Sequence, residues 1–382
     1  MQKREKPNMK IKLGQFDFIM CVVVIIMLSL GILMVLSASA PSSLSIYGNS
    51  YTYVGKQLGF AILGLVLMVF VSTIDYRKYK KFYWIAYIAS VGVLLLVLVP
   101  NLGVNVKGAT RWIDIKITRV QPSELTKLGL IIFYAGYLSE HRHNISNFLK
   151  GFLLPLILIV PPIAILYTVQ NHMSASLIIC FIAFTMMIMA GFKARYFIAI
   201  FGFAGSFLSG LFGLMQLSGY SNFRINRIST FFDPWSDSLG YGYQMIQSLY
   251  AIGSGGLFGV GLGDSKQKFL YIPEPHNDFI FAILAEELGF VGCLAVIILF
   301  AIFIWRGVII AMKAPDMFGS LIAIGITAVI GFQAIINIAV VTASIPTTGM
   351  SLPFFSYGGS ALLILLINVG ILLNISRYSS KI

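Results

Sequence analysis

The chain has 382 residues, of which 58% are hydrophobic and only 11% are charged, and its mean hydropathy is +0.88. This composition excludes an ordinary soluble protein of that length. The formal net charge of +13 suits either nucleic acid or an anionic membrane surface, and the hydropathy favours the membrane, so we expect no nucleic-acid partner.

Successive apolar runs of about 20 residues match the length of helix that crosses a bilayer core of about 30 Å. The sequence therefore predicts an all-α, polytopic membrane protein, with its first apolar run kept as a helix. The three cysteines lie inside apolar runs and are expected to pack there. The ten expected spans are 16–36, 55–72, 82–99, 122–138, 151–169, 174–190, 196–217, 278–305, 318–340 and 358–375.

Lys and Arg are dense in alternate connections, starting with the N-terminal tail 1–15 and the connection that contains Arg77 and Lys78. The positive-inside rule then predicts that both termini are cytoplasmic. Two outer connections carry basic residues against this trend: Lys107, Arg111, Lys116 and Arg119 in 100–121, and Arg224, Arg227, Lys266 and Lys268 in 218–277. They either solvate polar loops or bind an anionic group, since the Arg fork suits phosphate.

Two charged residues, Glu124 and Lys127, lie three apart near the start of the fourth span and share a helix face. Glu286 and Glu287 lie about two turns into the eighth span. Because an unpaired charge at membrane depth is costly, we expect a structural ion pair between Lys127 and Glu286 or Glu287. His172, in a short turn before the sixth span, is interpreted as a polar turn residue.

The large loop 218–277 is expected to be structured, because it is rich in aromatic residues. Its stretch 253–263, GSGGLFGVGLG, allows two interpretations. Glycine-rich backbone can cradle a phosphate through its N–H groups, or it can form a tightly packed turn.

The segment 273–289, PEPHNDFIFAILAEELG, concentrates ionisable residues where this loop meets a span. One interpretation is a helix start capped by Asn277 or Asp278. The other is a functional site made by Glu274, His276 and Asp278, because carboxylates at a membrane edge are expensive and tend to be functional.

The stretch 346–360, PTTGMSLPFFSYGGS, contains two prolines and a Gly–Gly pair that forbid one continuous helix. Broken backbone at a membrane face is tolerated where it is buried in protein or lines a cavity. We expect Gln333, Asn337 and Ser356 to line that cavity.

Four stretches in this order resemble the SEDS family (shape, elongation, division and sporulation proteins). They are KGATRWIDIKITRVQPSE at 107–124, FDPWSDSLGYGYQMIQ at 232–247, residues 259–289, and TGMSLPFFSYGGS at 348–360. The resemblance spreads over nearly the whole chain and implies one transmembrane domain over 1–382. The wording around 261–279 is more similar to the FtsW and SpoVE branch than to RodA.

The resemblance implies a peptidoglycan glycosyltransferase of the bacterial cytoplasmic membrane, which polymerises lipid II on the outer face with a class B penicillin-binding protein and other division or elongation proteins. The family's critical acidic residue carries over to Asp278, and its Arg and Trp carry over to Arg111 and Trp112. Asn277 stands where Thr is usual, and the turn at 170–176 departs from the family pattern. The other expected substrate contacts are Lys116, Arg119, Arg224, Arg227, Lys266, Lys268, Glu274, His276 and Ser356.

The chemistry fits that expectation. A sugar hydroxyl needs a general base, which Asp278 can supply, whereas the diphosphate leaving group needs charge neutralisation. Basic side chains or a divalent cation such as Mg²⁺ or Mn²⁺ would supply it, and we expect no organic cofactor. The alternatives are a lipid II flippase, since ten spans with broken segments also suit transport, and a non-catalytic division scaffold.

Overall fold

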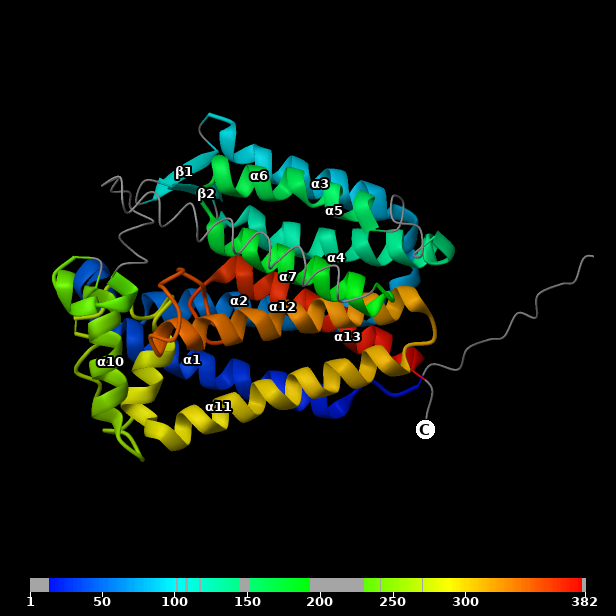
Figure 1. Cartoon of the computed structure of the whole chain (residues 1–382). Helices are drawn as coiled ribbons and strands as arrows, with labels where there is room; N and C mark the ends of the chain where they lie inside the picture. Colours follow the sequence, from blue (N-terminus) through cyan, green and yellow to red (C-terminus); the bar gives the residue numbers. More distant parts are fainter. Residues whose placement is uncertain are drawn as a thin grey trace, which may run out of the picture.

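The computed structural model describes residues 14–100, 102–106, 109–116, 118–144, 152–192, 230–240, 242–269 and 271–379. The expected span 196–217, most of the tail 1–15, Lys107, Arg224 and Arg227 lie outside these residues. Helices dominate the described chain (Figure 1). The α-helices are α1 (Phe18–Tyr47), α2 (Thr52–Thr73), α3 (Tyr83–Leu95), α4 (Pro122–Glu140), α5 (Leu154–Leu158), α6 (Val160–Thr168), α7 (Met173–Met189), α10 (Tyr243–Gly255), α11 (Ile280–Lys313), α12 (Met317–Val341) and α13 (Gly359–Tyr378). Short 3-10 helices cover η1 (Tyr76–Phe82), η2 (Leu96–Leu98), η3 (Arg142–Asn144) and η5 (Pro234–Asp237).

In the described chain, 6 helices are long and apolar enough to cross a membrane, and two shorter apolar helical stretches accompany them. Large apolar side chains such as Val66, Phe70 and Ile88 are more than half exposed on α2 and α3. A bilayer solvates such surfaces, whereas water would not. The prediction of an all-helical polytopic membrane protein is therefore confirmed.

A small antiparallel sheet was not predicted. It consists of β1 (Gly103–Val106), β2 (Ala109–Asp114) and β3 (Arg119–Val120), in the order β1-β2-β3. Val104 pairs with Trp112, and Asp114 pairs with Arg119. The sheet stands at one end of the helices and holds Arg111 and Trp112 on its middle strand (Figure 1).

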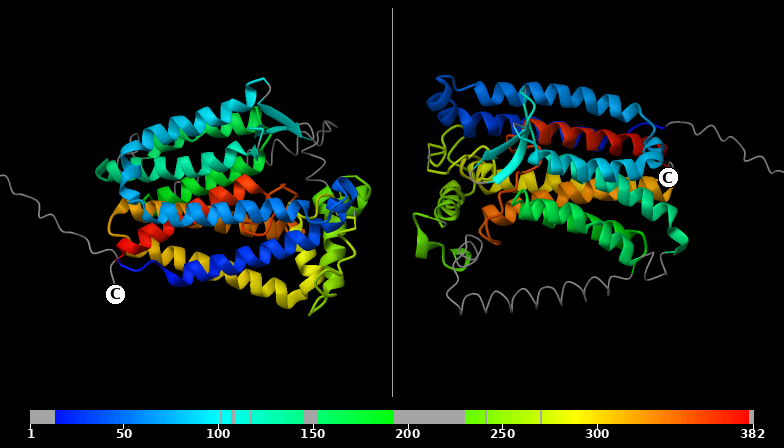
Figure 2. Two further views of the ribbon diagram at one scale, coloured as in Figure 1. Left: turned by 180° about the vertical axis from the view of Figure 1, so that it is seen from behind. Right: turned by 90° about the horizontal axis from the view of Figure 1, so that it is seen from above.

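The helices run side by side in the views of Figure 2. α13 packs on α2, α3 on α4, and α11 on both α12 and α1. Small residues allow the closest approaches, as is usual between membrane helices. At Gly31 of α1, an added Cβ would lie 2.1 Å from the carbonyl oxygen of Phe354. Any larger residue there would push the segment around Phe354 away from α1.

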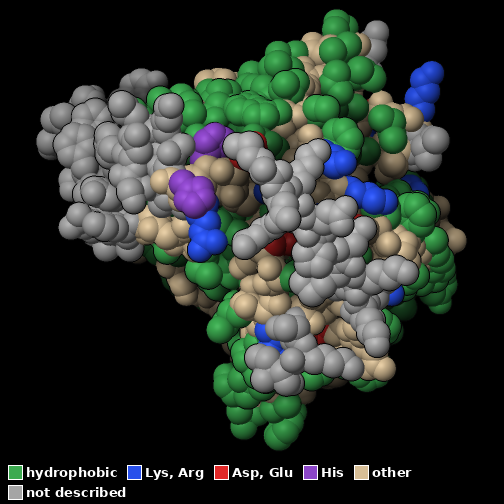
Figure 3. Space-filling view, turned by 90° about the vertical axis from the view of Figure 1, so that its right-hand side faces the viewer, with side chains coloured by type: hydrophobic (Ala, Val, Ile, Leu, Met, Phe, Trp, Pro, Cys, Tyr) green, Lys and Arg blue, Asp and Glu red, His purple; other side chains and the backbone are tan. Residues whose placement is uncertain are grey.

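The two ends of the bundle differ in composition. At the terminal end, defined by residues 14–17 and 376–379, Gly14 N–H donates to Arg377 O over 2.8 Å, and Arg306 pairs with Asp17. Lys and Arg side chains are spread over this end (Figure 3). The opposite, loop end carries the sheet, α10 and residues 343–358 (Figure 1).

The helix α11 is broken at Gly289, whose φ is 65° and ψ is −164°. The glycine-rich stretch 253–263 fits into this break: Val260 N–H donates to Glu286 O over 3.0 Å, and Gly261 N–H donates to Glu287 O over 3.1 Å. Phe290 N–H in turn donates to Gly256 O over 2.9 Å. These glycines therefore form a tightly packed turn whose N–H groups satisfy the helix backbone, and the phosphate-cradle interpretation is wrong for those two amides.

Candidate functional site

The candidate site is centred on residues 273–279, which we call the acidic segment. Residues 346–358, the broken segment, hold it through two hydrogen bonds. Ser356 Oγ donates to Asn277 O over 2.7 Å, and Tyr357 N–H donates to His276 O over 2.8 Å. The Ser356 hydroxyl also accepts from Leu352 N–H over 2.7 Å, so it fixes both segments at once. Two chain segments far apart in sequence are thus joined through their backbones.

A third contact comes from α12. The side-chain amide of Asn337 donates to Asp278 O over 2.8 Å and to Met350 O over 2.6 Å. Asn337 is only 1% exposed, and a buried amide that bridges two backbones fixes their spacing. Asn337 therefore fixes the backbone of the site, but it is not among the residues that line the cavity, contrary to the expectation from sequence.

The Asp278 side chain is half-buried at the loop end. Its Oδ2 lies against Gly349 of the broken segment, where an added Cβ would be 3.4 Å away. The helix α11 starts at Ile280, and its N-cap residue is Phe279, with no capping side chain. The N-cap position falls on Phe279, so the interpretation of Asn277 or Asp278 as the N-cap is wrong.

Two other residues of the acidic segment stabilise its turn. Glu274 has a positive φ of 52°, and its carboxylate accepts from the Asn277 side-chain amide over 3.0 Å. His276 is 4% exposed, and burial lowers its pKa to about 4. The imidazole is therefore neutral at neutral pH, and its ring packs at 4.6 Å from the ring of Tyr53, measured between centroids.

The sheet contributes Arg111 to the same end. Its Nε donates to Gln170 O over 3.2 Å and its Nη2 to Asn171 O over 2.6 Å, so it holds the turn between α6 and α7. That turn reaches the broken segment, because Ser174 Oγ donates to Thr348 O. Arg111 is thus connected through this turn to Thr348. Thr348 is followed by Gly349, against which the Asp278 carboxylate lies.

The other basic residues of the sheet region face outward. Lys116 and Arg119 are exposed, as is Lys266 of the large loop. Arg119 is 3.9 Å from Asp114, with both side chains well exposed, so this ion pair stabilises little. Trp112 on β2 is partly buried. The exposed cations can reach an anionic ligand, whereas Arg111 is engaged with backbone carbonyls.

His172 lies in the turn before α7, as its N-cap residue, which agrees with the interpretation as a turn residue. It is 7% exposed and its Nδ1 lacks a partner among the described residues. Burial, together with the charges of Arg111 and Lys127, lowers its pKa to about 3. The imidazole is therefore neutral at neutral pH. The sequence did not indicate this burial, because the turn at 170–176 departs from the family pattern.

The expected pairing of Lys127 with Glu286 or Glu287 is wrong. Lys127 Nζ lies 2.7 Å from Glu124 Oε1, one turn earlier on α4. The i,i+3 spacing already supplies a partner, so no distant carboxylate is needed. This buried pair is local to one helix.

The carboxylates of α11 have other partners. Glu287 Oε1 lies 3.0 Å from Lys268 Nζ and accepts from Ser37 Oγ of α1. Glu286 accepts from Ser265 Oγ and from Lys266 N–H, the latter over 2.9 Å. Lys268 is 4% exposed. The ammonium of Lys268 is thus paired inside the protein, and the structure does not present it as a phosphate ligand.

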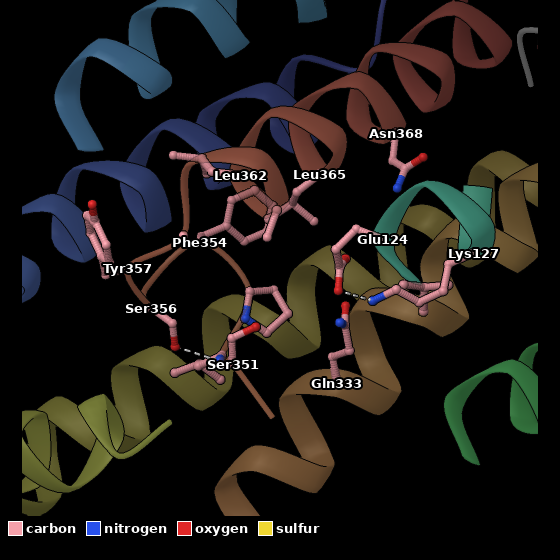
Figure 4. A pocket seen from close by; sticks show the side chains of 15 residues that line it. Glu124, Lys127, Gln333, Ser351, Phe354, Ser356, Tyr357, Leu362, Leu365 and Asn368 are labelled. Carbon is pink, nitrogen blue, oxygen red and sulfur yellow. Dashed lines mark hydrogen bonds and ion pairs between the residues drawn. The ribbon is translucent and has the colours of Figure 1, made fainter. Parts of the chain in front are cut away.

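Behind the broken segment lies a small cavity with a mixed lining, whose polar residues include Glu124, Lys127, Gln333 and Asn368. Figure 4 shows the Glu124–Lys127 pair beside Gln333, with Ser356 across from them. The cavity encloses about 30 Å³, which suits about two water molecules. Gln333 and Ser356 line it as expected, but a sugar does not fit there.

A metal site made of protein side chains alone is not apparent at this end. Across the described ranges, no group of three or more His, Cys, Asp or Glu side chains gathers. Mg²⁺ is commonly held by one or two carboxylates together with substrate phosphates. The donor set therefore gives no basis for routing a reaction step through a metal ion.

Comparison with known proteins gives a consistent family. Residues 17–381 match the family FTSW_RODA_SPOVE, described as cell cycle protein. The chain is 42% identical over 363 residues to stage V sporulation protein E of Bacillus subtilis, covering 95% of this chain and 97% of that protein. It is 38% identical over 361 residues to a probable peptidoglycan glycosyltransferase FtsW of Geobacter sp. strain M18, covering 94% and 96%.

The fold agrees with the sequence relatives. A chain from a peptidoglycan synthase complex, solved to show the structural coordination of polymerization and crosslinking, superposes with a TM-score of 0.78 at 28% identity, covering 95% of this chain and 98% of that one. Rod shape determining protein RodA of Thermus thermophilus gives a TM-score of 0.69 at 27% identity, covering 96% and 98%.

Proposed function

Since this chain belongs to the FtsW, RodA and SpoVE family and is a peptidoglycan glycosyltransferase of cell division or sporulation, we propose that Asp278 is its general base and lipid II its substrate. The observation that carries the proposal is the fixation of Asp278. Its segment is held by hydrogen bonds from Ser356, Tyr357 and Asn337, and its carboxylate lies against Gly349 of the broken segment. A rigidly supported carboxylate at a membrane edge suits catalysis.

The reaction balances with one carboxylate. The 4-hydroxyl of the acceptor sugar attacks the anomeric carbon of the donor and gives its proton to Asp278. The bond to the diphosphate breaks as the new glycosidic bond forms, and undecaprenyl diphosphate leaves with the electron pair. An α-linked donor becomes a β-linked product in one inverting step. Since a diphosphate is a weak base, no second carboxylic acid is needed, unlike in most glycosidases.

Charge neutralisation of the leaving group falls to basic side chains at the loop end. Of the expected residues, Lys116, Arg119 and Lys266 are exposed there. Arg111 acts through its two backbone carbonyl acceptors, which position the turn before α7. A divalent cation bound with the substrate phosphates stays part of the proposal, with no step assigned to it.

We place the loop end outside the cytoplasmic membrane and the termini inside. The supporting observation is the distribution of basic residues, with Lys80 and Lys81 in η1 at the terminal end. A single-cysteine protein with cysteine at Asp264 should be labelled by a membrane-impermeant maleimide on intact cells, and one with cysteine at Lys80 should be protected. The reverse pattern would overturn this orientation.

A class B penicillin-binding protein is the partner that we propose. The supporting observation is the similarity to a chain of a peptidoglycan synthase complex. Transport of lipid II finds little room at the cavity beside Lys127, which encloses about 30 Å³, although the described chain has a larger hollow of about 440 Å³ at the terminal end. A disaccharide needs far more room than about two waters.

The test is gel-resolved polymerisation of labelled lipid II by purified protein, with a partner whose own glycan activity is excluded. Asp278→Asn keeps the shape of the side chain but removes its basicity, and should reduce the rate about 10²–10⁴-fold. Asp264→Asn is the matched control, since Asp264 is an exposed carboxylate of the same loop. Equal glycan ladders from Asp278→Asn and Asp264→Asn would remove Asp278 from the mechanism.

A further inference from the structure

Four rings gather at the loop end, in a group that the reaction described above does not use. Tyr47 ends α1, Tyr53 lies in the first turn of α2, His276 belongs to the acidic segment and Tyr357 to the broken segment. The ring centroids of Tyr47 and Tyr53 are 5.6 Å apart, and those of Tyr53 and Tyr357 are 5.0 Å apart. We call these four residues the ring group.

The ring group has a fixed half and an open half. His276 is buried and Tyr357 half-buried, and the two are tied by the hydrogen bond between Tyr357 N–H and His276 O. Tyr47 is 51% exposed. Tyr357 lines the edge of the Glu124–Lys127 cavity, and its side chain lies beside the ribbons of the N-terminal helices (Figure 4). The open rings are therefore anchored directly on the backbone that carries Asp278.

The ring planes offer flat faces to a ligand. Tyr47 and Tyr53 meet at 73°, and Tyr53 and Tyr357 meet at 83°. In an edge-to-face pair, one ring turns its edge rather than its face toward the partner, and a ring face carries partial negative charge. The axial C–H bonds of a pyranose present a weakly positive, flat surface of matching size. Saccharides are therefore a natural ligand class for this corner.

A cation stands beside the open ring. Lys56 is exposed on α2, one turn after Tyr53, and its Nζ lies 5.5 Å from the Tyr47 ring centroid. The sequence analysis had placed it inside a span and gave it no role. An ammonium held over an aromatic face stays available to an anion on the same side. A saccharide with acidic substituents would use both the ring and the charge.

We propose that the ring group and Lys56 form a saccharide-binding platform that holds the glycan strand beside Asp278. The proposal rests on the proposed function and names a subsite of it. The rings stack on the sugars of a β-1,4-linked amino-sugar strand, and Lys56 contacts a carboxylate of the peptide stems. Bound there, the strand stays on the enzyme between additions, so the platform sets the length of the product.

Tyr51 provides the matched control. It precedes α2, is 66% exposed and lies at the same end of the bundle, but it is outside the ring group. Tyrosines at helix ends also anchor proteins at membrane interfaces. If both tyrosines only anchor the protein at the membrane interface, Tyr51→Ala and Tyr47→Ala should have the same effect on saccharide binding. If the ring group binds saccharide, only Tyr47→Ala should weaken it.

The binding experiment uses a lipid-free tetrasaccharide of alternating N-acetylglucosamine and N-acetylmuramic acid with peptide stems, observed by saturation-transfer NMR on the protein in nanodiscs. Wild type, Tyr51→Ala and Tyr47→Phe should bind it. Tyr47→Ala should bind about fivefold to tenfold more weakly. Lys56→Met should weaken binding of this tetrasaccharide but not of its stem-free form.

The second readout is product length in lipid II polymerisation. Tyr47→Ala should give shorter strands, and Tyr51→Ala should give strands of wild-type length. Equal binding and equal strand length for Tyr47→Ala and Tyr51→Ala would overturn the platform. Polymerisation by wild type without tetrasaccharide binding would also overturn it, while leaving the proposed function intact.

Failure of the proposed function has a different signature. Asp278→Asn should still bind the tetrasaccharide, because the platform does not need the base. Wild-type protein that binds the tetrasaccharide but makes no polymer with its partner would support the platform and reject the catalytic proposal. The two ideas can thus fail separately.

Discussion

Two buried lysine–glutamate pairs stabilise this protein in different ways. Lys127 pairs with Glu124, three residues away on the same helix, and Glu124 keeps 14% of its side chain exposed. Lys268 pairs with Glu287, whose side chain is fully buried, and also donates to Ser37 of α1 over 3.1 Å. The first pair only neutralises charge on α4. The second joins the large loop, α11 and α1, so it shapes the end of the molecule where Asp278 lies.

The contribution of an ion pair to stability depends on how far apart its two residues lie in the sequence. A local pair forms as soon as the helix forms, and water in the adjoining cavity can replace part of it. A pair between distant segments exists only in the folded protein, and its loss leaves a buried charge without solvent. The predictions below test this contrast, from the largest expected effect to the smallest.

Lys268→Met should be the most damaging change. It leaves Glu287 buried without its cation and should cost about 3–5 kcal/mol of unfolding free energy. The measurement is unfolding in detergent micelles, with Lys266→Met as control. Lys266 is the exposed neighbour, so its loss should cost within about 0.5 kcal/mol. Equal stability of the two variants would mean that the cross-segment pair contributes nothing.

Gly289→Ala tests the backbone contact that accompanies this pair. An alanine methyl group would lie 2.3 Å from Gly259 N, at a φ of 65°. Gly256, with a φ of 55° and a ψ of −145°, has similar backbone angles but open space around it. Both substitutions strain the backbone by about 1–3 kcal/mol. Gly289→Ala should lower the thermal unfolding temperature clearly more than Gly256→Ala does. An equal or smaller decrease would show that the backbone around Gly259 moves to accommodate the methyl group.

Lys127→Met should cost less than Lys268→Met, about 1–2 kcal/mol, because Glu124 retains access to water. The double variant Lys127→Met/Glu124→Gln removes both charges and should recover most of that loss. Detergent unfolding of the single and double variants is the measurement. A single variant as unstable as Lys268→Met would contradict the distinction between local and distant pairs.

The smallest expected effect is the change that Lys127→Met makes to a pH dependence of stability. The pKa of His172 is about 3, below the ordinary value near 6.5, so the unfolded chain takes up this proton before the folded protein does. Stability should therefore fall as pH drops from 6.5 toward 3, by at most about 1.4 kcal/mol per pH unit from this group. Lys127→Met removes one of the charges that lower the pKa, so the fall should be shallower. An unchanged slope of stability against pH would show that the charge of Lys127 does not affect the pKa of His172.

The helices could be predicted from sequence because their signal is local. Apolar runs of bilayer length give spans without reference to their neighbours. The sheet was missed because its strands have only 4, 6 and 2 residues, too short for a pattern of alternation. The start of α11 was placed two residues early, since Asp278 looks like a cap while the structure begins the helix at Ile280.

The site was predictable in its chemistry but not in its pairing. Asp278 and Ser356 stood out through motif and position, and the structure brings their segments together. The assignment of Lys127 failed because a distant carboxylate was preferred over Glu124, although the i,i+3 spacing was visible. His172 and Lys56 gave no signal, since their importance comes from neighbours that only the fold supplies. Tertiary packing decides which polar residues contact each other. These contacts could not be predicted from the sequence alone.

The break at Gly289 divides α11 into a portion that crosses the bilayer and a portion that follows Asp278. The portion from Phe290 to Lys313 comprises roughly 24 residues, which rise about 36 Å at about 1.5 Å per residue. That already crosses a hydrocarbon core of about 30 Å. The upper portion, which follows Asp278, is therefore not required for the crossing. When acyl chains lengthen or shorten, the lower portion can tilt to match while the upper portion stays docked on the glycine-rich stretch. The crossing of the bilayer and the support of the site are therefore carried by different portions of one helix.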